Sequence, residues 1–259
     1  MIVRSWESLL QGRAESPAAP AVLTIGVFDG IHIGHQRLLR EVVANRFGAA
    51  PVVGSFRQNP GRVLATRPVP GSLLSPRQKL AKFAGLGVAA LVLIDFSPEI
   101  STLTGKDFLA VLARAYAIRQ LVVGYNFRMG RGRATGVNEL GSLLSPFHAE
   151  LTVVTATLYR ERAVSSSRIR EAIVHGRFLE ARDMLGGEYC LDLAECPVEV
   201  HGGTAVLARS GTNQLLPGPG RYRSLLRGEG GDRPAEAEVT AAEIRWPAFT
   251  GTAEIVFSE

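Results

Sequence analysis

Two histidines, His32 and His35, lie in the stretch FDGIHIGH together with Gly30 and Gly34. The glycines allow the backbone to turn tightly and to approach a ligand closely. A helix expected to begin near His35 would present unpaired N–H groups and the positive end of its dipole, which attract anions. Two imidazole donors beside such a helix start suit a polyphosphate that gains charge during a reaction. The stretch therefore predicts a phosphate site, with a plain turn carrying two surface histidines as the alternative.

A second candidate phosphate site is the stretch AVSSSRIREA. Ser165, Ser166 and Ser167 are expected at a helix start, where hydroxyls cap the helix and backbone N–H groups point outward. Arg168 and Arg170 would add positive charge for phosphates. The alternative is an ordinary helix cap with solvated arginines.

Several common catalytic motifs are absent from the sequence. It contains no G-x-x-x-x-G-K-[ST], no G-x-G-x-x-G after the first apolar run, no H-E-x-x-H and no G-x-S-x-G. Cys190 and Cys196 are the only cysteines, and they form neither a disulfide framework nor a C-x-x-C metal pair.

Apolar runs alternate with amphipathic stretches through the first part of the chain. This pattern predicts an α/β fold, a Rossmann-like doubly wound parallel sheet of five strands with helices on both faces. The expected strands are 21–28, 51–56, 89–96, 120–127 and 150–156, and the expected helices are 35–48, 75–87, 105–117, 167–175 and 177–185.

Ligands of parallel sheets bind beyond the carboxyl ends of the strands. That rule selects the loops after the first and fourth strands, and it predicts that the histidines and Asn126 share one edge. The second of these loops, at residues 128–136, carries three arginines among glycines. It could close over an anion, or it could be a mobile exposed loop.

The last part of the chain has a different pattern. Short apolar runs separated by Gly/Pro turns predict a small antiparallel β module. Residues 1–186 hold 23 basic and 13 acidic residues, a net charge of +10, whereas residues 187–259 hold 6 and 11, a net charge of −5. The change falls at Gly186-Gly187, so we expect domains at 1–186 and 187–259.

Composition limits the classes of partner. Hydrophobic residues make up 46% of the 259 residues, enough for a full core, and no apolar run approaches a membrane span. The N-terminus lacks the apolar core of a signal peptide, so we expect a cytoplasmic protein without a membrane partner. The pI near 9.6 favours anionic ligands. No basic stripe interleaved with aromatic residues indicates nucleic acid.

The stretch GVFDGIHIGH resembles the signature of H-x-G-H nucleotidyltransferases. Its Phe-Asp-Gly lead-in is similar to the first module of bacterial FAD synthetases, the bifunctional riboflavin kinase/FMN adenylyltransferase family. The resemblance covers roughly residues 20–186. Its other motifs are VVGSFRQNP, LLSPRQKLAKFAGLGVAALVLIDFSPEISTLTGKDFL, LVVGYNFRMGRGRATG and VSSSRIREAIVHGRFLEARDMLG.

The resemblance implies that the chain transfers the adenylyl group of ATP to FMN, giving FAD and pyrophosphate, with Mg²⁺ held mainly by the phosphates. It implies catalytic roles at the ATP phosphates for His32, His35, Ser166, Ser167 and Arg168. It implies that nucleotide and flavin contact Gly26, Phe28, Asp29, Gly30, Gly34, Phe56, Asn59, Pro60, Gly124, Asn126, Phe127, Arg128 and Ser165.

The sequence departs from the family at several positions, including Gln58, which stands at the first proline of a family motif. Asn59 stands at a family histidine, and Ala163 at a position where many members have arginine. The C-terminal residues lack the Gly-x-Pro-Thr-Ala-Asn signature of riboflavin kinase, so we expect a shortened remnant of that module and a monofunctional enzyme. The alternatives are a flavin-nucleotide-binding protein with weakened catalysis, or an adenylyltransferase for another phosphorylated acceptor such as pantetheine phosphate or nicotinate mononucleotide.

Overall fold

The computed structural model describes residues 1–11, 19–45, 47–63 and 71–258. The chain divides into two compact units. The first consists of Met1–Phe28, Gly34–Pro68 and Ala81–Thr157. The second consists of Asp29–Ile33, Val69–Leu80 and Leu158–Glu259. Each unit is therefore assembled from segments that are distant in the sequence.

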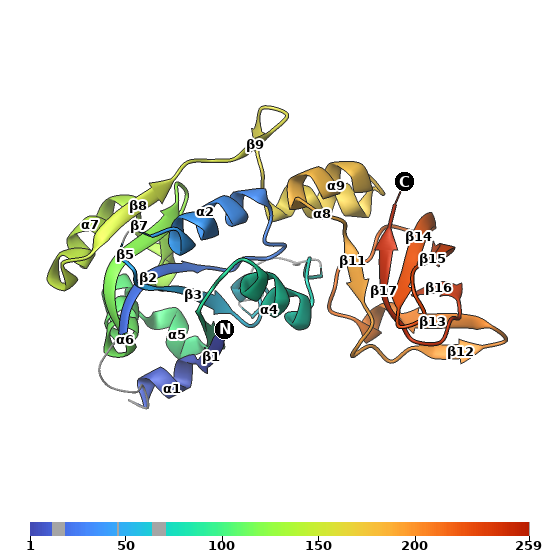
Figure 1. Ribbon diagram of the computed structural model, residues 1–259, viewed down its shortest axis with the longest axis horizontal. Helices are drawn as coiled ribbons and strands as arrows, with labels where there is room; N and C mark the ends of the chain where they lie inside the picture. The colour runs from blue at the N-terminus through green and yellow to red at the C-terminus, as the bar shows by residue number, and fades with distance from the viewer. Residues whose placement is uncertain (12–18, 46, 64–70, 259) are drawn as a thin grey trace. The chain divides into compact units, whose positions relative to one another are not determined.

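A six-stranded parallel sheet forms the centre of the first unit (Figure 1). This confirms the predicted α/β fold and corrects its strand count. In spatial order the strands are β1 (Ile2–Ser5), β4 (Ala90–Ile94), β3 (Ala50–Phe56), β2 (Ala19–Gly26), β5 (Tyr116–Gly124) and β8 (Glu150–Val154).

The extra strand is β1, which the sequence analysis did not predict. It pairs with β4 in the register Ile2 to Ala90. It has only four residues, and Ile2 and Val3 are exposed. Such a short edge strand has no alternation of buried and exposed residues that a sequence pattern would reveal.

Helices cover both faces of this sheet, because both sides of its strands are apolar. On β2, Leu23 and Ile25 belong to one hydrophobic core, and Val22 is buried on the opposite face. Figure 1 shows α2 (Ile33–Val43) on one side and α1 (Trp6–Leu10) and α6 (Gly105–Ala115) on the other. Trp6 of α1 stacks on Phe108 of α6 with ring centroids 4.4 Å apart.

Several element boundaries differ from the predicted ones. Helix α2 begins at Ile33, so His35 lies inside its first turn. Strand β5 begins at Tyr116, directly after α6 ends at Ala115, and not at residue 120. The first unit also contains α3 (Pro60–Val63), α5 (Pro98–Thr102), α7 (Val137–Leu144) and the paired strands β6 (Arg128–Met129) and β7 (Thr135–Gly136), and α4 (Pro76–Gly85) spans residues of both units.

The second unit contains a seven-stranded antiparallel sheet, which confirms the predicted β module. In spatial order its strands are β11 (Cys190–Asp192), β17 (Thr252–Phe257), β14 (Gly220–Gly228), β15 (Arg233–Val239), β16 (Glu243–Pro247), β13 (Thr204–Ala208) and β12 (Glu199–His201). The unit also holds α8 (Ser166–Val174), α9 (Phe178–Leu185) and the hairpin of β9 (Leu158–Tyr159) and β10 (Arg162–Ala163).

The core of the second unit contains residues from both sides of Gly186. Ile169 and Phe178, from α8 and α9, share one cluster with Leu207 and Trp246 of the β strands. A domain boundary at Gly186-Gly187 stays a prediction of the sequence, while the compact unit that contains the β module also includes both helices.

Two glycines of the loop after β5 provide a matched test of its packing. Gly130 and Gly132 have φ angles of 74° and 59°. A Cβ at Gly130 would lie 2.6 Å from the backbone nitrogen of Gly105, whereas a Cβ at Gly132 would meet nothing within 4 Å. We expect Gly132→Ala to lower the free energy of unfolding by about 1 kcal/mol through backbone strain. Gly130→Ala should cost roughly 1–3 kcal/mol more through the clash. Urea denaturation measures both, and equal losses would contradict this packing.

Candidate active site

The first unit places several predicted site residues at one edge of its sheet. β2 and β5 are parallel neighbours that end at Gly26 and Gly124. His35 in the first turn of α2 and Asn126 follow these strand ends. Both residues therefore lie at the carboxyl edge of the sheet, where α/β proteins bind their ligands.

Phe28 packs against the first turn of α2. Its ring is 2% exposed and makes edge contacts with the rings of His35 and Phe83, with centroids 5.1 and 5.7 Å away. Gly26 leaves room for this ring, because a Cβ there would lie 3.0 Å from Phe28 Cε2. Phe28 is thus a packing residue that sets the position of the His35 ring.

The loop after β5 is anchored to the first unit. Asn126 is exposed, and the N–H of Phe127 donates to the carbonyl of Gly124 at 3.0 Å. Further along, the N–H of Arg131 donates to the carbonyl of Leu103 at 2.7 Å. The backbone is therefore held at both ends of the loop, and Arg128 within it is exposed.

The residues predicted for the flavin side lie at the end of β3 and directly after it. The ring of Phe56 contacts Phe96 edge-on, with centroids 5.8 Å apart. Pro60 is the first residue of α3, and the side-chain oxygen of Asn59 accepts from the N–H of Gly61 at 3.0 Å. Asn59 therefore stabilises this turn locally. Its predicted contact with flavin stays a prediction.

In the second unit, both carboxylate oxygens of Asp29 have partners within the fold. Oδ1 accepts from the N–H of Leu73 at 2.8 Å, and Oδ2 forms an ion pair with Arg170. The carbonyl of Asp29 accepts from the hydroxyl of Ser166 at 2.9 Å. The sequence suggested Asp29 as a ligand contact, but these partners assign its carboxylate to the protein's own structure.

The residues after Asp29 form a strained turn. Gly30 has φ 85°, and a Cβ there would lie 2.9 Å from Leu73 Cδ1. Ile31 has φ 42°, which β-branched residues rarely adopt, and it is fully buried. His32 is 6% exposed, and burial lowers its pKa from 6.5 to about 4. The imidazole of His32 is therefore neutral at physiological pH.

The three serines of the second motif have three different environments. The side chain of Ser165 caps α8 by accepting from the N–H of Arg168 at 3.3 Å. Ser166 donates to Asp29, as described above, and Ser167 is exposed in the first turn of the helix. Of the three hydroxyls, that of Ser167 is the one placed to meet a ligand from solvent.

Arg168 does not have the environment of a free phosphate-binding side chain. Its Nη1 donates to the carbonyls of Arg162 at 2.8 Å and Ala163 at 3.0 Å, and both terminal nitrogens reach the carbonyl of Tyr159 at 3.3 Å. The guanidinium thus fixes the β9–β10 hairpin. The predicted contact of Arg168 with the ATP phosphates stays a prediction.

Sequence reasoning missed Lys79 and the structural role of Arg170. Burial lowers the pKa of the Lys79 ammonium to about 8, although the nearby charge of Asp29 acts in the opposite direction. Nothing local in the sequence links residues 29, 79 and 170. Among the described residues, no group of three or more His, Cys, Asp or Glu could hold a metal ion.

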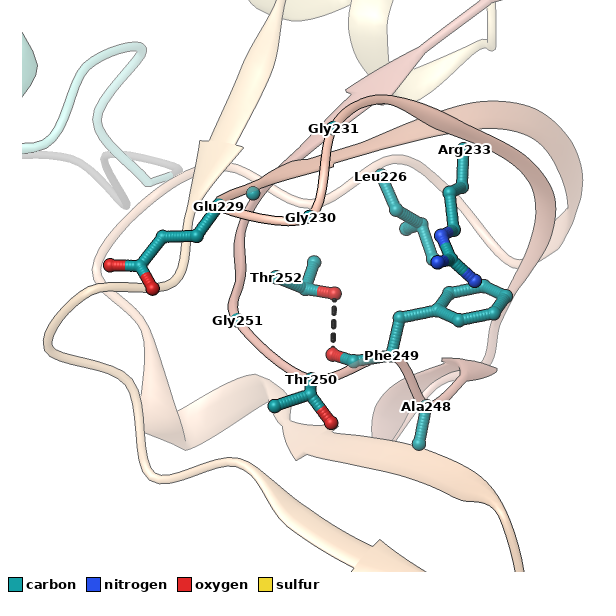
Figure 2. Close-up of a pocket in the computed structure, with 11 residues that line it drawn as sticks. Leu226, Glu229, Gly230, Gly231, Arg233, Ala248, Phe249, Thr250, Gly251 and Thr252 are labelled. Atoms are coloured by element: carbon teal, nitrogen blue, oxygen red, sulfur yellow. Dashed lines mark hydrogen bonds between the residues drawn. The ribbon is translucent and has the colours of Figure 1, made fainter.

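A cavity of about 560 Å³ opens between two turns of the β module (Figure 2). It contains none of the predicted site residues. Arg233 lies over the ring of Phe249 at 4.8 Å, and the Thr252 hydroxyl donates to the carbonyl of Phe249 at 2.8 Å. Figure 2 shows Glu229 pointing away from the cavity. Arg233 and Thr252 thus have partners within the cavity lining, Glu229 is directed away from it, and we do not assign catalysis to this cavity.

Comparison with known proteins identifies the family. The profile of the FAD synthetase family matches residues 14–168, which is more than half of the chain. The chain belongs to the FAD synthetase family. This confirms the resemblance drawn from the motifs.

Two curated relatives illustrate the match. A FAD synthetase of Listeria monocytogenes is 32% identical over 168 residues, 64% of this chain and 68% of the relative. A bifunctional riboflavin kinase/FMN adenylyltransferase of the same organism is 28% identical over 171 residues, 65% of this chain and 54% of the relative. The match spans about half the length of the bifunctional relatives.

One solved structure is similar along nearly the whole chain. The crystal structure titled as a macrolide-efflux protein from Streptococcus pneumoniae has a TM-score of 0.81 at 24% identity, covering 99% of this chain and 90% of that one. This likeness shows the fold. No described helix of the present chain is long and apolar enough to cross a membrane.

The depressed pKa of His32 predicts a pH-dependent stability. Above pH 6.5 neither the folded nor the unfolded chain holds the extra proton at this site. As the pH falls from 6.5 to about 4, the unfolded chain binds a proton that the folded chain rejects. The free energy of unfolding should therefore decrease by roughly 3 kcal/mol over that range. His32→Gln should remove this part of the slope in urea denaturation, and an unchanged slope would contradict the buried neutral imidazole.

Proposed function

We propose that this chain is an FMN adenylyltransferase that converts FMN and ATP to FAD and pyrophosphate. The observation that carries this proposal is the family match, which includes both the histidine turn and the serine cap. The anchored loop and the carboxyl-edge placement of His35 and Asn126 support it.

The proposed reaction is a direct in-line displacement. An oxygen of the FMN phosphate attacks the α-phosphorus of ATP, and the bond from that phosphorus to the bridging oxygen of the β-phosphate breaks. The electron pair leaves with pyrophosphate. The attacking phosphate is already ionised, so no side chain needs to remove a proton. Catalysis then consists of positioning and of stabilising charge on the phosphate oxygens.

The residues of this chain suit those two tasks. The N-terminus of α2 offers N–H groups and a positive dipole end to the phosphates. His35 lies in that first turn, and the buried, neutral His32 lies in the turn that leads into it. Ser167 at the start of α8 is proposed to contact the pyrophosphate end of ATP. Magnesium would arrive with ATP as part of the substrate, where its ligands are mainly phosphate oxygens and water.

The proposal includes a single activity in the cytoplasm, where FMN and ATP are available. The β module lacks the Gly-x-Pro-Thr-Ala-Asn signature, and the one charged side chain over its cavity, Arg233, is stacked on Phe249. The other phosphorylated acceptors are less well supported, because the middle segment resembles the FAD synthetases. A protein that only binds flavin nucleotides has less need of histidine donors.

The direct test is an assay of products by chromatography. Purified protein with FMN, ATP and Mg²⁺ should form FAD and pyrophosphate. With riboflavin and ATP it should form no FMN, because the kinase signature is missing. FMN formation at a rate comparable to FAD formation would overturn the monofunctional proposal. Absence of FAD under all conditions would overturn the adenylyltransferase proposal.

The phosphate role of His35 has a kinetic test. His35→Asn should lower kcat for FAD formation by roughly 10²–10³-fold, the scale for the loss of one preorganised donor. Binding of FMN should change little. The matched control is His175→Asn, since His175 is exposed beyond the end of α8. Near-normal turnover of His35→Asn would show that this imidazole does not stabilise the transferred phosphate.

A further inference from the structure

The turn that carries His32 belongs to the same compact unit as the β module. Asp29–Ile33 directly follows β2 in the chain, yet it forms part of the second compact unit together with Val69–Leu80 and Leu158–Glu259. The β module itself has no assigned role once kinase activity is set aside. Its contacts with residues 71–78 of the same unit indicate what it does.

Asp29 is the residue that fixes the turn. Its side chain is 11% exposed, as is that of Arg170, so their ion pair is largely shielded from water. A shielded carboxylate is stable only when its oxygens are paired. Leu73 supplies the second partner through its N–H, and Lys79 adds a nearby positive charge. The strained φ angles of Gly30 and Ile31 persist because these partners determine where the turn begins.

Leu73 belongs to a segment that the β module holds in place. Next to it, the N–H of Ser72 donates to the carbonyl of Asn213 at 2.8 Å, and the N–H of Leu215 donates to the carbonyl of Ser72 at 2.9 Å. Gly71 lies so close to this strand-like pairing that a Cβ there would be 2.5 Å from the backbone of Gln214. The backbone of Asn213–Leu215 is thus in direct contact with the segment.

Asp192 of β11 makes a second connection to the same segment. Arg77 donates to both of its carboxylate oxygens, at 2.8 and 3.0 Å, and the hydroxyl of Ser75 donates to it at 2.5 Å. The carboxyl of Asp192 is 4% exposed, and these donors keep its pKa below the usual range despite burial. Gln78 adds a hydrogen bond of 3.2 Å to the carbonyl of Cys190.

We propose that the β module serves as the scaffold of the His32 turn in the adenylyl-transfer site. The module fixes residues 71–78 by hydrogen bonds. Leu73 in that segment then fixes Asp29, where the turn of His32 begins. Asp29, Arg170 and Asp192 are then positioning residues, since they act on the reaction through the turn and touch no substrate. The kinetic part of this inference rests on the proposed function. The structural part does not.

The test combines hydrogen exchange with kinetics on the full chain. Asp192→Asn removes the charge that holds Arg77 and Ser75 but keeps the side-chain shape. Amide exchange should become about tenfold faster in residues 71–78 and also in residues 29–33. The value of kcat for FAD formation should fall about tenfold. The KM for FMN should not change, because the predicted flavin contacts, Phe56 and Pro60, lie in the other unit.

Two further variants keep the result interpretable. Glu236→Gln is the matched control, because Glu236 is an exposed carboxylate of the same sheet that pairs with Arg221 at 3.6 Å and lies on β15, which is not adjacent to β11. It should change neither exchange nor kcat. Arg77→Lys keeps the positive charge but loses the bidentate contact with Asp192. It therefore weakens the same connection less, and it replaces Asp192→Asn if that variant folds poorly.

The exchange rates test the scaffold role of the β module, and FAD formation tests the proposed function. Faster exchange in residues 71–78 with unchanged exchange in residues 29–33 would overturn the inference, as would a fall of kcat in Glu236→Gln equal to that in Asp192→Asn. If exchange changes as expected while the unsubstituted protein makes no FAD, the adenylyltransferase proposal fails and the scaffold stands.

Discussion

The shielded carboxylate of Asp29 is the constraint on which the rest of this site depends. A carboxylate removed from water must find hydrogen-bond donors and a counter-charge, because otherwise its desolvation outweighs the gain from folding. Asp29 obtains them from Leu73, 44 residues along the chain, and from Arg170, 141 residues along. Three distant segments must therefore be in place together before the turn of His32 has its final shape.

This arrangement suits a reaction that depends on position more than on proton transfer. The turn presents a buried, neutral imidazole and leads into the N-terminus of α2, so its donors are fixed dipoles that need no reorganisation when charge develops. A flexible loop with two exposed histidines would offer the same groups at a greater cost in conformational entropy. The strain at Ile31 is the local consequence of that fixed geometry.

Patterns that lie within one element were readable from the sequence, and pairings between distant elements were not. The strands β2, β3 and β4 were predictable because their apolar runs are bounded by Gly, Pro or a helix signal. The start of β5 was not, because Tyr116 follows α6 without any turn residue. The same distinction separates the capping serine Ser165, visible from local spacing, from the ion pair of Asp29 with Arg170.

Arg168 shows that residue type alone does not reveal the partners of a side chain. An arginine beside a helix start is a natural phosphate ligand, but in this fold the β9–β10 hairpin brings its own carbonyls to the guanidinium first. Arg170, two residues on, lies on a different face of α8 and meets Asp29. Both side chains are largely buried by partners from other segments, and no pattern within the serine motif reveals those partners.

The most direct test of adenylyl transfer follows the phosphates of ATP into the products. The protein is incubated with FMN, Mg²⁺ and ATP that carries a label either in the α-phosphate or in the γ-phosphate. Direct adenylyl transfer predicts that the α label appears in FAD and the γ label in pyrophosphate. Recovery of the γ label in a flavin product, or of the α label only in AMP or ADP, would contradict it.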